Sequence, residues 1–143
     1  MPSDLALKAM NAIHRTVLTV SRGRAGWVAW DMPVLRLTTT GRRSGRPRAV
    51  MLTSPLQEGT TLVVVASRGG DDRPPAWLLN LQETPTVAVR LQGQPTVDMQ
   101  ARVATAEERD RLWPRVVADH TNYAAYQSRT SREIALVLLE PTA

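Results

Sequence analysis

The first part of the chain has apolar residues at helical spacing. Met10, Ile13 and Val17 lie three or four residues apart, which places them on one side of an α-helix, and Arg15 belongs to the opposite, basic side. The pattern predicts an amphipathic helix over residues 3–20. Such a helix fits two roles: packing onto the domain as a surface helix, or peripheral contact with a membrane.

Short segments typical of β-strands follow. In residues 96–104, apolar side chains such as Val97 and Met99 alternate with polar ones, as expected for a strand with one solvated face. The six expected strands cover residues 34–39, 48–54, 61–66, 86–91, 96–104 and 134–140. Gly59 and Gly93 mark short connections, so neighbouring strands should run antiparallel.

Two helices interrupt the predicted strands. A short one should begin near Pro75 and end before Pro85. The other should begin with a capping box formed by Thr105 and Glu108. Pro114 is expected to kink this second helix or to restart it, because proline lacks the N–H that a helix interior needs.

These elements predict a mainly β domain with helices, of the α+β class. Six antiparallel strands suggest a small barrel that closes its own edges. The expected organisation is an N-terminal helix and connection over residues 1–31, followed by one barrel domain over residues 32–143.

Composition and charge limit the kinds of site and binding partner that the protein can have. The 143 residues fit one compact domain, and the absence of cysteine excludes disulfides, thiolate metal sites and a cysteine nucleophile. Residues 1–50 carry nine basic and two acidic side chains, whereas the remainder carries nine and eleven, which predicts an anionic partner near the N-terminal third. The N-terminal MPSD lacks the basic region of a secretory signal, so a cytoplasmic location is expected, with any membrane contact at the inner face.

The most informative stretch is TTTGRRSGRPR, residues 38–48, which holds four arginines and no acidic residue. Gly41 and Gly45 allow the backbone to turn tightly, and the planar fork of arginine suits phosphate and carboxylate. The stretch fits either a phosphate-binding loop or a solvated basic hairpin. Its SGRP segment is similar to minor-groove hooks, but those are usually disordered tails, and no phenylalanine is present for stacking on bases. No nucleic-acid partner is therefore expected.

Residues for hydrolytic catalysis are scarce. His14 and His120 lie far apart and belong to no metal-ligand spacing, so no metal is expected. Ser44 lies in GRRSG, which is not a nucleophile-elbow pattern. An enzyme with this composition is expected to rely on a bound cofactor for its chemistry.

Three ordered motifs resemble the deazaflavin-dependent nitroreductase family, split-barrel proteins that use coenzyme F420. The motifs are MPVLRLTTTGRRSGRPR, VVASRGGDDRPPAWLLNL and WPRVVADHTNYAAYQSRTSREIALVLLEP, and the resemblance spans residues 32–141. It implies a split β-barrel like that of FMN-binding proteins. It also implies a coenzyme whose phosphate and polyglutamate tail would account for a basic site.

The resemblance places the coenzyme on three segments: the basic loop for the phosphate end, the ASRGG turn, and the helix that carries WxxN. The matching residues are Arg42, Arg43, Ser44, Arg48, Ala66, Ser67, Arg68, Gly69, Trp77 and Asn80. Without the resemblance, Trp77 would be read as a core aromatic about as readily, and Asn80 as a helix-end residue that satisfies backbone groups.

His120, Tyr123 and Tyr126 recur every three residues, which on a helix places three hydrogen-bonding side chains along one side. The resemblance implies that residues near these positions line the acceptor pocket and take part in catalysis. The alternative is that the two tyrosines bury their rings in the core with satisfied hydroxyls.

The predicted function is an F420-dependent oxidoreductase that moves a hydride from reduced deazaflavin to a quinone-like or nitroaromatic acceptor. Two alternatives remain open from the sequence. One is a non-catalytic protein of the same fold that binds F420 or a fatty-acyl lipid. The other is a reductase that uses FMN as its cofactor.

Overall fold

The computed structural model describes Val28–Ala29 and Met32–Thr142. The strands are β1 (Val28–Ala29), β2 (Met32–Thr40), β3 (Pro47–Thr53), β4 (Leu56–Glu58), β5 (Thr61–Val65), β6 (Thr86–Leu91), β7 (Val97–Val103) and β8 (Leu136–Pro141). The helical elements are the 3-10 turn η1 (Arg68–Gly70) and the helices α2 (Ala76–Glu83), α3 (Ala106–Asp119) and α4 (Asn122–Ser128). The helix expected over residues 3–20 lies outside the described residues and stays a prediction.

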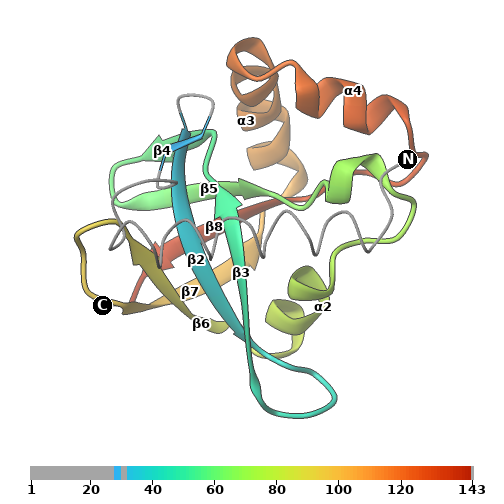
Figure 1. Cartoon of the computed structure of the whole chain (residues 1–143). Helices are drawn as coiled ribbons and strands as arrows, with labels where there is room; N and C mark the ends of the chain where they lie inside the picture. Colours follow the sequence, from blue (N-terminus) through green and yellow to red (C-terminus); the bar gives the residue numbers. More distant parts are fainter. Residues whose placement is uncertain (1–27, 30–31, 143) are drawn as a thin grey trace.

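The strands form one curled antiparallel sheet (Figure 1). Its order is β3-β2-β6-β7-β8-β5-β4, and β1 pairs with the start of β2. All six expected strands are present, and the described residues add two short ones, β1 and β4. Within the described residues no pairing closes the sheet between β3 and β4, so it is a half-barrel rather than the closed barrel expected from the sequence.

A buried serine forms the corner between the two end strands of this sheet, because only Ser54 and Pro55 separate β3 from β4. The Ser54 N–H donates to the Pro33 carbonyl at 3.0 Å. Its hydroxyl lies 2.9 Å from the Leu56 carbonyl oxygen and 2.8 Å from that of Val63. Ser54 is 1% exposed, so these contacts hold the turn inside the protein.

The curled sheet is covered on both faces. Val137 and Leu139 of β8 belong to an inner cluster that includes Trp77 of α2. Leu136 and Leu138 of the same strand belong to an outer cluster with residues of α3 and α4. A strand buried on both faces explains the continuous apolar run in β8.

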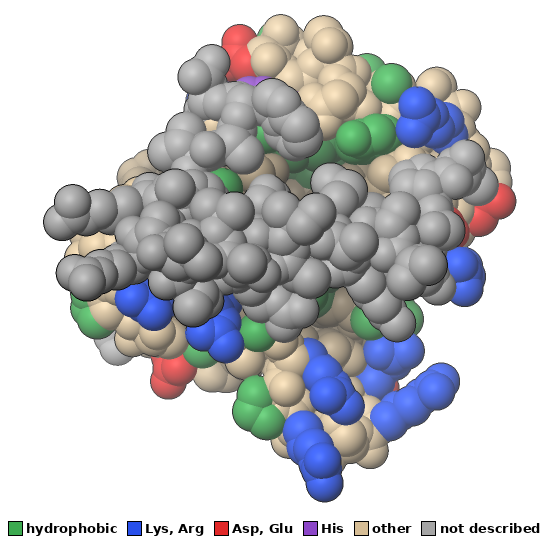
Figure 2. Space-filling view, in the orientation of Figure 1, with side chains coloured by type: hydrophobic (Ala, Val, Ile, Leu, Met, Phe, Trp, Pro, Cys, Tyr) green, Lys and Arg blue, Asp and Glu red, His purple; other side chains and the backbone are tan. Residues whose placement is uncertain are grey.

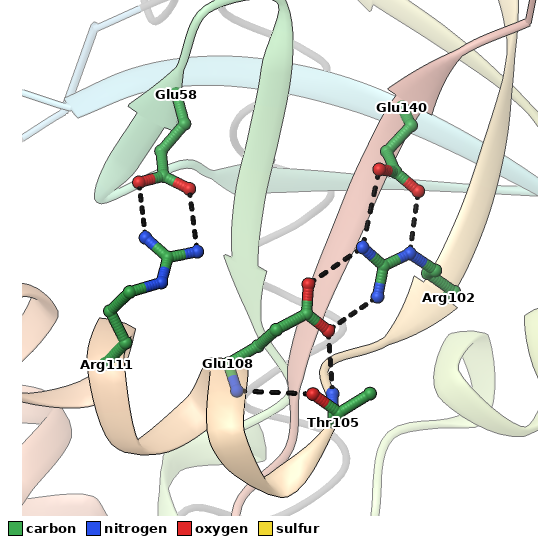
Figure 3. A network of polar contacts seen from close by, with 6 residues as sticks. All are labelled: Glu58, Arg102, Thr105, Glu108, Arg111 and Glu140. Atoms are coloured by element: carbon green, nitrogen blue, oxygen red, sulfur yellow. Dashed lines mark hydrogen bonds and ion pairs between the residues drawn. The ribbon is translucent and has the colours of Figure 1, made fainter.

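Helix α3 begins as predicted and is tied to the sheet by one arginine. The Thr105 hydroxyl accepts from the Glu108 N–H at 3.2 Å, and the Glu108 carboxylate accepts from the Thr105 N–H at 2.9 Å. Arg102 of β7 donates to the same carboxylate at 2.6 and 2.8 Å and to Glu140 of β8 at 2.7 Å (Figure 3). The network joins two strands to the first turn of α3.

Of the two outcomes expected at Pro114, a kink or a restart, the restart is wrong, because α3 continues through Pro114 to Asp119. Pro114 and Asp110 are both exposed. The carbonyl that loses its helical partner at Asp110 can therefore bind water.

Candidate functional site

The loop between β2 and β3, residues 41–46, is held by its own backbone. The Gly41 N–H donates to the Arg46 carbonyl and the Gly45 N–H to the Gly41 carbonyl, both at 2.8 Å. A Cβ on Gly41 would lie 2.7 Å from the Ser44 Oγ, and Gly45 has a φ of +70°. Both glycines are needed for this turn. The loop therefore projects its side chains from a defined backbone.

Asn80 of α2 anchors this β2–β3 loop to the rest of the domain. Its Oδ1 accepts from the Arg42 N–H at 3.2 Å and from the Arg42 Nη1 at 3.1 Å. Its Nδ2 donates to the Thr39 Oγ1 at 3.0 Å. Asn80 is 4% exposed and Thr39 1% exposed, so the bond between them is buried, and the bonds to Arg42 are partly buried. The structure thus brings together Arg42 and Asn80, two of the residues expected at the coenzyme.

The remaining arginines of the segment, Arg43, Arg46 and Arg48, are exposed. Arg48 donates to the Ser44 Oγ at 3.4 Å. Among the described residues no carboxylate lies within ion-pair distance of these three guanidinium groups. Figure 2 shows basic side chains gathered at the lower end of the molecule, where Figure 1 shows this loop. The site there is suited to an anion.

The turn η1 has an unusual backbone. Arg68, Gly69 and Gly70 have φ values of 46°, 64° and 82°, all in the left-handed region. A Cβ on Gly70 would lie 2.6 Å from the Tyr126 carbonyl oxygen, so only glycine lets α4 pack this closely on the turn. The turn and α4 therefore form one packed unit.

A buried carboxylate lies beside the expected coenzyme residue Arg68. Asp71 is 8% exposed, and its Oδ1 is 3.3 Å from the Arg68 Nη1. The backbone N–H of Arg73, which donates to this carboxylate at 2.8 Å, lowers the pKa of Asp71, and the charge of Arg68 acts in the same direction. Asp71 thus stays ionised and fixes the direction of the Arg68 side chain.

Tyr123 and Tyr126 differ in their surroundings. Tyr123 is 6% exposed, its hydroxyl lies 3.2 Å from the Thr53 Oγ1, and burial raises its pKa. Tyr126 is half-buried, and among the described residues no hydrogen bond involves its hydroxyl. The two rings contact edge to face, with 6.1 Å between centroids, and His120 contacts Tyr123 in the same way at 6.4 Å. The three residues lie together with Tyr123 in the middle, but the expectation of one shared helix is wrong, because His120 is the C-cap of α3 and the tyrosines belong to α4.

Two residues expected at the coenzyme lie in the core. Trp77 is 7% exposed and packs in the inner cluster, and Ala66 has no exposed surface. Ala66 borders Ser67, which is half-buried. A role of Trp77 and Ala66 in binding the coenzyme stays a prediction.

Two arginines that the sequence did not single out contact η1. Arg132 donates to three backbone carbonyls around the turn, and Arg129 donates to the Gly69 carbonyl at 3.4 Å. Neither residue follows a periodic pattern in the sequence. The one feature of the sequence that could have indicated them is the presence of two arginines three residues apart, shortly before a strand.

These segments lie along one side of the molecule. In Figure 1, α4 is at the top, η1 lies below it, and α2 and the β2–β3 loop follow toward the bottom. The order agrees with the packing of α4 on Gly70 and with the Arg42–Asn80 contact. We call this side, made by the β2–β3 loop, α2, η1 and α4, the basic face.

The described residues hold no group of three or more His, Cys, Asp or Glu side chains that could bind a metal ion. Within the same residues, every helix is too short or too polar to cross a membrane.

Comparison with known proteins gives three findings. The sequence profile of a family described as F420H(2)-dependent quinone reductase matches residues 12–141. An F420H(2)-dependent quinone reductase of Mycobacterium tuberculosis is 36% identical over 131 residues, which are 89% of this chain and 87% of that protein. Two solved structures are also similar.

The first of these structures is an F420-H2 dependent reductase, FDR-A, with 38% identity and a TM-score of 0.65 over 76% of this chain and 94% of that one. The second is a domain-swapped dimer with 30% identity and a TM-score of 0.68 over 92% of this chain and 99% of that one. Sequence and fold therefore point to the same group of proteins.

Proposed function

The chain belongs to the F420H(2)-dependent quinone reductase family and is an F420-dependent oxidoreductase, and from this premise we propose that its basic face binds the coenzyme. Coenzyme F420, when bound in its reduced form, supplies the hydride that reduces a quinone. The protein's own residues bind the coenzyme, orient it and provide a proton at the acceptor. A nitroaromatic acceptor is a second substrate class for the same site.

The observation that carries this proposal is the group of exposed arginines on the β2–β3 loop and the start of β3. Arg43, Arg46 and Arg48 have no carboxylate partner among the described residues. Guanidinium groups bind phosphate and carboxylate through paired, charge-assisted hydrogen bonds. The phosphate and the glutamate tail of F420 are groups of these kinds, so the donor set fits the coenzyme. Ser44 adds a hydroxyl at the centre of the loop.

The ring end of the coenzyme, opposite its phosphate and glutamate tail, is assigned to η1. Ser67 and Arg68 are half-buried, and Gly69, which is buried, lets the backbone turn with a positive φ of 64°. Arg68 is held by Asp71, so its guanidinium can approach a polar ring edge without reorganising. Asn80 keeps α2 and the β2–β3 loop at a fixed separation between the two ends.

The acceptor is assigned to α4. Reduction of a quinone leaves negative charge on an oxygen, which a nearby hydroxyl or imidazolium can stabilise and protonate. Tyr126 offers a hydroxyl that no described residue uses, whereas the Tyr123 hydroxyl is bonded to Thr53. We therefore assign the direct contact to Tyr126 and a supporting role to Tyr123, through their edge-to-face contact. His120 lies beside Tyr123 and is assigned to acceptor choice.

Titration of the purified protein with F420, FMN and a fatty acid tests the proposal. We expect F420 to bind most tightly and Arg43→Ala to weaken its binding. Arg111→Ala is the matched control, because Arg111 of α3 is also an exposed arginine but is paired with Glu58 of β4. Tighter binding of FMN would favour the FMN reductase, and preferred binding of the fatty acid would favour a lipid carrier. Either result would contradict the proposal.

A further inference from the structure

Arg132 lies in the connection between α4 and β8 and directs its guanidinium at η1. The Nε donates to the Asp71 carbonyl at 2.9 Å, the Nη2 to the Ser67 carbonyl at 2.8 Å and the Nη1 to the Ala66 carbonyl at 3.2 Å. These carbonyls flank the turn on both sides. One rigid, planar group therefore fixes where the turn begins and where it ends.

The turn needs such support because its backbone is intrinsically unfavourable. Arg68 is the one non-glycine residue with a positive φ in the described chain. The left-handed conformation is disfavoured for a side chain with a Cβ, so Arg68 adopts it only where neighbouring contacts hold it. Two backbone bonds close the turn, from the Gly70 N–H to the Ser67 carbonyl at 2.9 Å and from the Asp71 N–H to the Arg68 carbonyl at 3.1 Å.

The contacts of Arg132 also determine the direction of the amide groups. In a planar trans peptide the N–H points opposite to the C=O of the same unit. Because the Ala66 and Ser67 carbonyls point at Arg132, the N–H groups of Ser67 and Arg68 point away from it. The guanidinium thus orients the N–H groups of Ser67 and Arg68, two donors in the part of the chain that we assign to coenzyme binding.

We propose that Arg132 is a positioning residue that holds η1 in its coenzyme-binding conformation, an inference that rests on the proposed function of the basic face. It acts through the backbone of the turn and does not itself contact the coenzyme. Burial lowers the pKa of Arg132, but guanidinium remains charged at neutral pH, so the three contacts persist.

The test compares Arg132→Gln with Arg109→Gln in the full chain. Arg109 supports the same connection from its other side, through the Ile134 carbonyl at 3.1 Å and the Gln127 Oε1 at 3.1 Å. None of its described contacts involves η1. A loss of F420 affinity caused by loosening the connection between α4 and β8 should appear in both variants. A loss of affinity caused by releasing η1 should appear only in Arg132→Gln.

The first measurement is amide hydrogen exchange without coenzyme. We expect the Gly70 and Asp71 amides to exchange faster in Arg132→Gln and at the parental rate in Arg109→Gln. The second is F420 affinity, where the Kd should rise by about tenfold in Arg132→Gln, as for the loss of one charge-assisted hydrogen bond. The KM for the quinone should stay unchanged. Arg132→Lys keeps the charge and one donor, and should lie between the parent and Arg132→Gln in both measurements.

Equal effects of Arg132→Gln and Arg109→Gln on exchange and on F420 Kd would overturn the inference. Exchange rates and an F420 Kd equal to those of the parent in Arg132→Gln would also overturn it. If Arg132→Gln does not fold, the same result in Arg132→Lys would overturn it. Failure of the parent protein to bind F420 is a different result, because it would contradict the proposed function itself, and the exchange measurement on Arg132 does not depend on it.

Discussion

Arg48 contacts a neutral hydroxyl, the Ser44 Oγ, rather than a carboxylate. An exposed guanidinium without an acidic partner can bind an anion without first losing an ion pair. We predict that Arg48→Ala raises the Kd for F420 by roughly tenfold, since a hydrogen bond to a charged group contributes about 1.5 to 3 kcal/mol. Fluorescence titration of the coenzyme measures it. Parental affinity in a folded variant would remove Arg48 from the site.

Tyr126 is the residue whose single hydroxyl can be tested most cleanly. Tyr126→Phe keeps the ring that packs against Tyr123 and removes only the hydroxyl. We predict an unchanged Kd for F420 and a kcat that falls by about 100-fold, the lower end for loss of a general acid. Steady-state kinetics with menadione measures both.

Tyr123→Phe is the matched comparison. Its hydroxyl bonds to Thr53 in a buried position, so the variant should lose about 1 kcal/mol of unfolding free energy and keep most of its kcat. The reverse pattern, with kcat lost in Tyr123→Phe and kept in Tyr126→Phe, would exchange the two assignments.

Among single residues, the resemblance connected positions that the hydrophobic pattern alone does not connect. The partly buried contact of Arg42 with Asn80 confirms that the two motifs lie together, although their sequence separation of 38 residues gives no sign of it. Arg132 was missed because its partners are backbone carbonyls, which leave no signature in the sequence. Trp77 was ambiguous because the same side chain can fill a core and border a site.

Among the elements, α3 has the strongest described ionic attachment. Arg102 bonds the Glu108 carboxylate through two nitrogens, and Thr105 completes the capping box (Figure 3). The pKa of Glu108 is lowered to about 2. The hydrogen bonds from Arg102 are the largest cause, and the hydrogen bond from the Thr105 N–H is the second. The network therefore depends on an ionised Glu108.

The pH dependence of stability follows from this shift. A carboxyl whose folded pKa lies below its unfolded value stabilises the protein fully above the unfolded pKa. The contribution of Glu108 should be complete above about pH 4.5 and disappear as the pH falls toward about 2. We predict that Glu108→Gln lowers the unfolding free energy at neutral pH by about 1 kcal/mol, through the weakened cap and ion pair.

Denaturant unfolding of the parent and Glu108→Gln at several pH values measures this difference. The gap between the two proteins should narrow as the pH falls from about 5 to 2. A gap that stays constant over this range would show that the charge of Glu108 does not stabilise α3.

The strands and helices were more predictable than the connections between them. Alternation located β7, and the capping box located the start of α3. β1 and β4 have two and three residues, too few for a periodic signal. The helix did not restart at Pro114, because the Asp110 carbonyl, which has lost its helical partner, belongs to an exposed residue and can bind water. The corner between β3 and β4 depends on the turn at Ser54, whose hydrogen bonds the sequence does not reveal.

For the whole molecule, the uneven charge along the chain becomes a charged face. The nine basic side chains of residues 1–50 include the arginines of the β2–β3 loop. Binding through exposed charges is screened by salt, with a Debye length of about 10 Å at 0.1 M and 3 Å at 1 M.

We therefore predict that the Kd for F420 rises several-fold between about 0.05 and 0.5 M NaCl, and that the KM for menadione, which is uncharged, stays nearly constant. Titrations and initial rates across this range measure the two quantities. A Kd for F420 that does not change with salt would show that the coenzyme is held without the exposed arginines.

The central claim is that this protein transfers a hydride from F420H2 to a quinone. The most direct measurement is a single turnover, in which the purified protein loaded with F420H2 is mixed rapidly with menadione and the return of oxidised F420 is followed by absorbance. We predict rapid oxidation that requires the protein, with FMNH2 unable to replace F420H2. Oxidation of F420H2 no faster than in the absence of protein would contradict it.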